Sequence, residues 1–284
     1  KVSPQISPDG KKLAYIAPVN NVLNVWVGDL DESGNYLNPV AVTSDTNRGI
    51  RGFSWSPDSK QILYTQDTNG DENWRLYGVD LETKTTRNYT PFDKVHVGIS
   101  QIDKRHRDSI LIAMNKENPK FHDVYKLNLK TGDLSMIYKN PGYFESFIID
   151  DNQAVVAAVK TSPDGSSQLF VKKDETFQPI LTWGPEDAPV SSPVGITADP
   201  NYLYVEDSRN SDTAKLVKLN INTLKSEILL EDPKYDISGV IIDGDTHKIL
   251  WATIVKDKQE VIIFDENYKT VFENLKKLDS GEIH

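Results

Sequence analysis

An internal repeat with a spacing of about 46 residues constrains the fold of this chain more than any other feature of its sequence. A short strand of alternating hydrophobicity, ending in Asp or Asn, occurs six times. Its last residues are Asp29, Asp80, Asn128, Asp174, Asn220 and Asp265, which are 51, 48, 46, 46 and 45 positions apart. Independent hairpins would not be expected to keep such a spacing, so the chain is predicted to be an array of equivalent structural units.

A second pattern interleaves with the first and completes each unit. It consists of a short strand, a tight polar turn and an apolar strand, and it is clearest at residues 5–16 and 53–65, with weaker copies beginning near residues 99, 147, 194 and 240. Pro8 and Pro57 preset the backbone for the turn in the two clear copies. Two hairpins per period make a four-stranded blade, which can bury both faces of its sheet only against neighbouring blades. The predicted fold class is therefore an all-β propeller.

The spacing places six blades in a single domain over residues 1–284. Their expected ranges are approximately 1–45, 50–92, 97–140, 144–185, 192–232 and 237–278. Residues 281–284 could begin a further strand, so we expect either a six-bladed ring or, preferably, a seven-bladed ring that has been cut. The chain starts at Lys1 without Met, which indicates a processed or shortened start. Localisation is therefore unknown, with the cytoplasm and the periplasm both open.

Composition excludes several classes of function. The net charge of −10 is spread along the chain without a basic stripe, which argues against a nucleic-acid partner. No apolar run approaches eighteen residues, so no membrane span is expected. The absence of Cys excludes disulfides and a Cys nucleophile. The histidines lack the i, i+4 spacing of a metal-binding pair, and neither a metal nor a cofactor is predicted.

The most specific stretch of sequence lies in the second blade. It combines Trp-Ser-Pro-Asp at residues 55–58 with Gly-Asp-Glu-Asn-Trp-Arg-Leu-Tyr at residues 70–77. This stretch resembles the propeller of prolyl oligopeptidase family serine peptidases, particularly the acylaminoacyl-peptidase and dipeptidyl-aminopeptidase-like branch. The resemblance covers residues 51–92 well and the whole chain loosely. It implies a propeller that caps a C-terminal α/β-hydrolase domain of the same polypeptide and limits the access of large, folded substrates.

In such peptidases the catalytic residues of the hydrolase domain, which would cleave the peptides, are a Ser nucleophile, an Asp and a His. That domain is inferred to be missing here, so this chain is expected to have no catalytic residue and to be inactive alone. The nearest match to a nucleophile turn, residues 52–56, has Ser56 in place of the final Gly and is predicted to be an inner strand. Residues 29–34 imitate a calcium loop, but Val40 stands where a bidentate Glu is needed, which favours a hairpin turn.

Five polar residues of the second blade and its approach are candidates for binding a substrate or contacting another domain: Arg48, Arg51, Asp71, Glu72 and Arg75. The last three lie between the second and third strands, on the face that bears the connections between blades. If the hydrolase domain meets that face, as the resemblance implies, Glu72 could bind the free amino terminus of a peptide, or Arg75 could pair across the interface. The alternative is that Asp71 and Asn73 satisfy backbone groups of a structured turn while Trp74 packs between blades.

Two functions remain open from the sequence because a fold does not determine a function. The first is the noncatalytic, gating propeller of a serine peptidase. The alternative is a stand-alone TolB-like propeller that acts as a protein-protein interaction module. A propeller glycosidase or lyase would need carboxylates that converge near the axis, and no such set is indicated.

Overall fold

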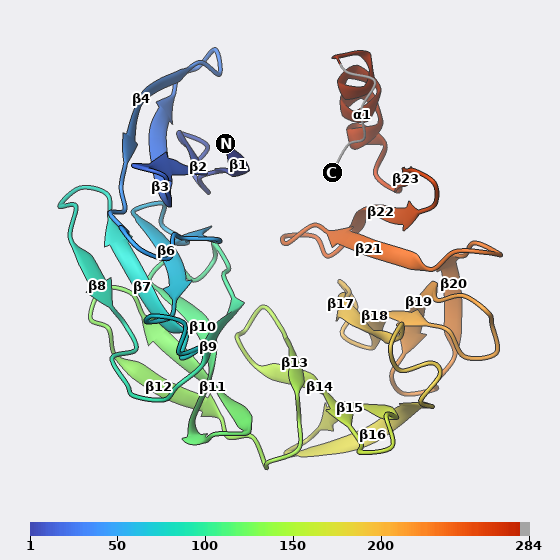
Figure 1. Ribbon diagram of the computed structural model, residues 1–284. Helices are drawn as coiled ribbons and strands as arrows, with labels where there is room; N and C mark the ends of the chain where they lie inside the picture. Colours follow the sequence, from blue (N-terminus) through green and yellow to red (C-terminus); the bar gives the residue numbers. More distant parts are fainter. Residues whose placement is uncertain (279–284) are drawn as a thin grey trace. The chain divides into compact units, whose positions relative to one another are not determined.

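The structure, a computed structural model, describes residues 1–278 and consists almost entirely of antiparallel β-sheets (Figure 1). The further strand considered for residues 281–284 lies outside the described residues. The chain divides into two compact units, Lys1–Gly142 and Tyr143–His284. Each unit contains three sheets, and within every sheet the strands follow one another in chain order.

The first unit contains three four-stranded sheets. Their strands are β1 (Val2–Ile6), β2 (Lys12–Val19), β3 (Val22–Leu30) and β4 (Tyr36–Ala41); β5 (Ser54–Trp55), β6 (Gln61–Gln66), β7 (Arg75–Asp80) and β8 (Thr86–Asn88); and β9 (Val97–Gln101), β10 (Ser109–Asn118), β11 (Phe121–Asn128) and β12 (Leu134–Tyr138).

The second unit contains two four-stranded sheets, one three-stranded sheet and a helix. Their elements are β13 (Ser146–Ile149), β14 (Val155–Thr161), β15 (Ser167–Lys173) and β16 (Thr176–Trp183); β17 (Ser192–Ile196), β18 (Tyr202–Asp207), β19 (Lys215–Asn220) and β20 (Ser226–Leu230); and β21 (Ile237–Ile242), β22 (Ile249–Val255), β23 (Gln259–Ile263) and α1 (Glu266–Leu278).

Consecutive residues of a central strand supply two different hydrophobic cores, because side chains alternate between the faces of a sheet. Ile62 of β6 packs with residues of the first sheet, whereas Leu63 packs with residues of the third. In the second unit, Leu216 of β19 packs with the sixth sheet and Val217 packs with the fourth. Within each unit, neighbouring sheets thus cover one another in the way that propeller blades do, and the predicted all-β propeller class is confirmed.

The Ser-Pro-Asp turns explain the two clearest copies of the repeat. The Ser56 hydroxyl donates a hydrogen bond to Asp58 Oδ1 at 2.7 Å and accepts one from the Gln61 amide at 2.9 Å. Ser7 and Asp9 form the same bond in the first blade, at 2.6 Å. These side chains satisfy backbone and hydroxyl groups that the sheet leaves unpaired at the turn. The recurring residues are therefore required by the turn itself.

The sixth sheet departs from the four-stranded pattern because α1 follows β23. Asp265 ends the repeat as in the other blades, but its carboxylate accepts a hydrogen bond from the Asn267 amide at 2.9 Å, the geometry of a helix N-cap. Tyr268 and Phe272, one turn apart, both pack against Trp251 of β22, with ring centroids 5.2 and 5.3 Å away. These aromatic contacts attach one side of the helix to the sheet, and Phe272 is the buried residue of the helix. Among residues 1–278, no helix has the length and hydrophobicity of a membrane-spanning segment.

Candidate functional site

The loop between β6 and β7, residues 67–74, is tied to the connection that enters its blade. Arg48 Nε lies 3.2 Å from Oδ1 of Asp67, whose side chain is only 1% exposed. The side-chain amide of Asn47 donates a hydrogen bond to the Asn69 side chain at 3.1 Å. Loss of Arg48 would leave the buried Asp67 carboxylate without its counter-ion, which is costly. Arg48 is therefore part of the framework of this loop.

Arg75 ties the same loop to the connection that leaves the blade. Its Nε donates a hydrogen bond to the Phe92 carbonyl at 3.2 Å, and its Nη1 donates one to the Thr68 hydroxyl at 3.2 Å. Nη1 also lies 3.8 Å from Asp71 Oδ2. Only 15% of the Arg75 side chain is exposed, and its guanidinium is already engaged by these contacts. Its predicted role in an interface with another domain stays a prediction.

Asp71 organises the turn at the tip of the loop. Its Oδ1 accepts hydrogen bonds from the amides of Thr68 and Asn73 at 3.0 and 3.1 Å, and its Oδ2 accepts one from the Asn73 side chain at 3.0 Å. The Asn73 side chain, the Thr68 amide and the nearby Arg75 all favour the carboxylate, so the pKa of Asp71 lies below its usual value. Asp71 and Asn73 thus have the local role that the sequence offered as the alternative.

Arg48 and Asp71 are exposed but engaged within the loop, which leaves Glu72 and Arg51 as the other exposed candidates. Within residues 1–278 neither side chain forms a hydrogen bond or an ion pair. Glu72 has a φ of 55°, in the left-handed region that residues other than Gly adopt infrequently, and its amide donates to the buried Asp67 carboxylate at 3.4 Å. The loop therefore presents the exposed Glu72 carboxylate beside Asp71, whose own carboxylate is engaged within the turn.

A pocket of about 490 Å³ lies beside this loop, within the size range of small-ligand sites. It is lined by residues of the second and third sheets and of their connection, among them Ser54, Tyr64, Thr65, Trp74 and His96. Tyr64 stacks on Tyr77 with ring centroids 5.4 Å apart. Burial and the neighbouring Tyr77 raise the pKa of Tyr64 to about 12, so this phenol is neutral at physiological pH. The pocket offers aromatic surface beside the loop that carries Glu72.

A pair of histidines in the third sheet was not predicted from the sequence. His96 precedes β9 and His122 lies on β11, so the strand β10 separates them. Their rings meet nearly at right angles, with Nδ1 of His96 3.2 Å from Nε2 of His122. Burial and the proximity of His96 lower the pKa of His122. The residues are 26 positions apart, and their approach depends on the registers of two strand pairs, so no local sequence signal revealed it.

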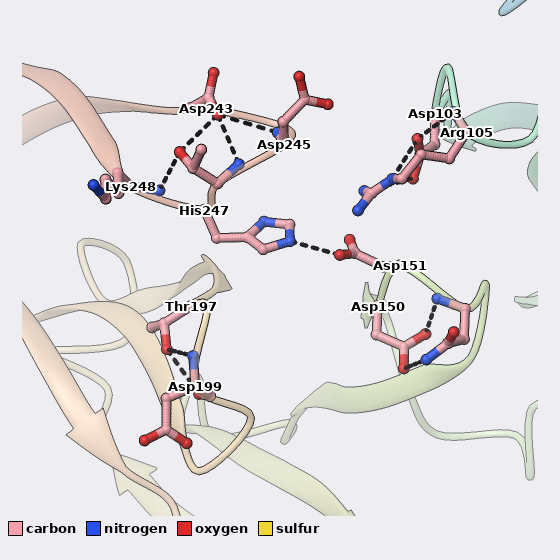
Figure 2. A network of polar contacts seen from close by, with 12 residues as sticks. Asp103, Arg105, Asp150, Asp151, Thr197, Asp199, Asp243, Asp245, His247 and Lys248 are labelled. Atoms are coloured by element: carbon pink, nitrogen blue, oxygen red, sulfur yellow. Dashed lines mark hydrogen bonds and ion pairs between the residues drawn. The ribbon is translucent and has the colours of Figure 1, made fainter.

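Carboxylates of the second unit gather in the turns that join the first two strands of each sheet (Figure 2). Asp150, Asp199 and Asp243 each accept a hydrogen bond from the amide two residues later, at 3.0, 2.9 and 3.2 Å. Asp151 instead pairs with His247, with Oδ2 and Nε2 2.8 Å apart. Turn formation accounts for the first three carboxylates. Within residues 1–278, no three His, Asp or Glu side chains come close enough to hold a metal ion.

The Arg48–Asp67 pair leads to a test of the loop framework. Replacing Asp67 with Asn is expected to destabilise the chain by about 1–2 kcal/mol, because Arg48 loses a buried partner but remains partly hydrated. Urea unfolding at neutral pH measures the loss, and the exposed Asp93→Asn substitution on the next connection is the matched control. Equal stabilities of the two variants would show that the ion pair does not hold the loop.

Two curated proteins are similar to the chain along nearly its whole length. The chain is 34% identical to dipeptidyl aminopeptidase BIII of Pseudoxanthomonas mexicana over 98% of its own length and 40% of that protein's. It is 27% identical to dipeptidyl peptidase family member 6 of Caenorhabditis elegans over 94% of its own length and 38% of that protein's. The chain thus spans about two fifths of the length of these relatives. No family model matches it.

Solved structures share the fold at lower identity. The acylaminoacyl peptidase of Pyrococcus horikoshii has a TM-score of 0.53 at 16% identity, with 97% of this chain and 46% of that one covered. The β-propeller domain of the Trilobed protease from Pyrococcus furiosus has the same score and identity, with 93% and 81% covered. The resemblance predicted from the second blade is confirmed by the 34% identity to the dipeptidyl aminopeptidase, and the solved structures share the fold of the chain.

Proposed function

We propose that this propeller, which is homologous to a dipeptidyl aminopeptidase over 98% of its length, is the noncatalytic domain of a prolyl oligopeptidase-like serine peptidase. In this proposal, a separate α/β-hydrolase domain of the same polypeptide carries the Ser nucleophile and cleaves peptides, and the propeller gates their access. Supporting this, the matched relative is much longer than the region it shares with this chain, which leaves room for a catalytic domain. The propeller alone binds and selects substrates but performs no chemistry.

The face that bears the β6–β7 loop is proposed to contact the hydrolase domain. Arg48 and Arg75 attach this loop to the connections before and after the second blade, so the three segments form one continuous, braced surface. A surface that positions a substrate for another domain needs such support, because small displacements cost much of the catalytic rate. The exposed Arg51 is available at this face for a carboxylate of the hydrolase domain.

Glu72 is proposed to bind the free amino terminus of the peptide. The observation that carries this proposal is an exposed carboxylate held in a left-handed backbone conformation, without a cationic partner among the described residues. A carboxylate and an ammonium group form a charge-assisted hydrogen bond, which is stronger than one between neutral groups. The pocket lined by Tyr64 and Trp74 lies beside the loop and can take an apolar side chain from the start of the peptide.

Matched substrates test this function in the intact protein. Dipeptidyl chromogenic substrates with a free amino terminus are expected to be cleaved faster than the same substrates with an acylated one, and folded proteins are expected to resist cleavage. Equal rates for free and acylated substrates would contradict the role of Glu72. Cleavage of folded proteins at the rate of short peptides would contradict gating, and failure to cleave any of these substrates would contradict the peptidase assignment.

A further inference from the structure

The His96–His122 pair is built into its sheet from both sides. The His96 amide donates a hydrogen bond to the Asn115 side chain at 2.6 Å, and the Asn115 amide returns one to the His96 carbonyl at 3.3 Å. The Asn140 side chain donates a hydrogen bond to the His122 carbonyl at 3.1 Å. Asn115 lies on β10, the strand between the two histidines. The backbone positions of both residues are therefore held in place independently of their rings.

The two rings are accessible to small solutes. Val95 and Val97, on either side of His96, are 2% exposed and belong to the core between the second and third sheets. Side chains alternate between the faces of an extended segment, so the His96 ring points away from that core. His96 is exposed and His122 is half-buried. An ion can therefore reach the ring nitrogens without any opening of the fold.

We propose that His96 and His122 together bind a single divalent transition-metal ion of the Zn²⁺ class. Zinc binds imidazole nitrogens at about 2.0–2.1 Å in tetrahedral geometry, which sets two nitrogens on one ion about 3.3 Å apart. The nitrogens here are 3.2 Å apart, so the pair has the required spacing and needs only small ring rotations. On binding, each imidazole donates a nitrogen lone pair to the metal, and the hydrogen bond between the rings is lost.

The donor set determines which ions the site accepts and how tightly. Imidazole suits Zn²⁺, Ni²⁺ and Cu²⁺, whereas Mg²⁺ and Ca²⁺ require oxygen ligands. Within the described residues no third His, Asp or Glu joins the pair, so water is expected to complete the coordination. Binding is consequently reversible and weaker than at a four-ligand structural zinc site. This inference is independent of the proposed peptidase function, because it concerns the isolated chain.

Calorimetric titration of the isolated, untagged chain with ZnCl₂ at neutral pH tests the site. We expect one ion bound per chain and a loss of affinity of about tenfold or more, equivalent to about 1.4 kcal/mol, in both His96→Asn and His122→Asn. His106→Asn is the matched control, because it removes a histidine in the turn between β9 and β10, and it should bind as the unsubstituted chain does. Zn²⁺ should also raise the Tm of the unsubstituted chain but not that of the double variant.

A measurement on the unsubstituted chain guards against variants that fail to fold. Zn²⁺ should shift the imidazole nitrogen resonances of two histidines together, with the same dependence on metal concentration, and EDTA should reverse the shifts. The proposal is overturned if millimolar Zn²⁺ produces no saturable binding. It is equally overturned if the affinity survives unchanged in both variants, or if the two resonances that move belong to other histidines.

Discussion

Replacing Glu72 with glutamine in the intact peptidase is expected to lower kcat/KM about 10–100-fold for dipeptidyl substrates with a free amino terminus, because a hydrogen bond to a charged group contributes about 1.5–3 kcal/mol. Glutamine keeps the size of the side chain and removes its charge. The positive φ of 55° at Glu72 is equally tolerable for glutamine, so the loop should keep its shape. N-acylated substrates carry no ammonium group, and their kcat/KM should not change.

The control for this prediction is Glu82→Gln, which removes an exposed carboxylate at the opposite end of β7. It should leave the rates for both substrate types unchanged. If the Glu72→Gln substitution lowers kcat/KM by the same factor for free and acylated substrates, its effect is on the structure of the loop. If kcat/KM is unchanged for both substrate types, Glu72 does not bind the substrate.

Replacing Trp183 with alanine is expected to destabilise the second unit by about 3–5 kcal/mol, the usual cost of truncating a fully buried aromatic side chain. Trp183 is 0% exposed and packs in the core between the fourth and fifth sheets. Its indole Nε1 also donates a hydrogen bond to Asp207 Oδ1 at 3.1 Å. Urea unfolding of the isolated chain measures the loss. Trp26→Ala, at a half-buried position in the first unit, is the comparison and should cost less; an equal cost would contradict the packing described.

The stability of the second unit is expected to depend on pH through Asp207, the hydrogen-bond partner of Trp183. Burial alone would raise the pKa of Asp207, but hydrogen bonds from Arg209, the closest at 2.8 Å, outweigh it and lower the pKa below the ordinary 3.8. A carboxylate with a lowered pKa in the folded state stabilises the fold above the unfolded pKa. The contribution of Asp207 should therefore be complete at neutral pH and be lost as the pH falls below about 3.8. An Asp207→Asn variant should show a weaker loss of stability over that acid range.

The fold could be predicted because its determinants are local. Ile62 and Leu63 are consecutive apolar residues, as a strand buried on both faces requires. The Ser56 turn has a counterpart at Ser7 because the Ser hydroxyl completes the hydrogen bonding of the turn. Helix α1 was harder to predict, since Asp265 ends the repeat like its counterparts and only the residues after it favour a helix. Contact with Trp251 stabilises the helix, and that contact depends on the tertiary structure.

The candidate site could be predicted only in outline. The sequence located the β6–β7 loop, but it could not distinguish the braced Arg75 from the exposed Glu72, because the partner of Arg75 is a backbone carbonyl 17 residues away. The approach of His96 to His122 likewise follows from strand registers on either side of β10. Sequence patterns indicate which face a side chain occupies, and the structure is needed to show which side chains meet there.

Hydrolysis assays on the isolated chain and the intact protein, side by side, test the central claim most directly. The substrates are aminoacyl, dipeptidyl and N-acyl-aminoacyl chromogenic compounds, with and without a serine-directed covalent inhibitor. The account predicts activity in the intact protein alone, abolished by the inhibitor. Activity of the isolated chain, or an intact protein that cleaves none of the substrates, would contradict the assignment of this propeller as the noncatalytic domain of a serine peptidase.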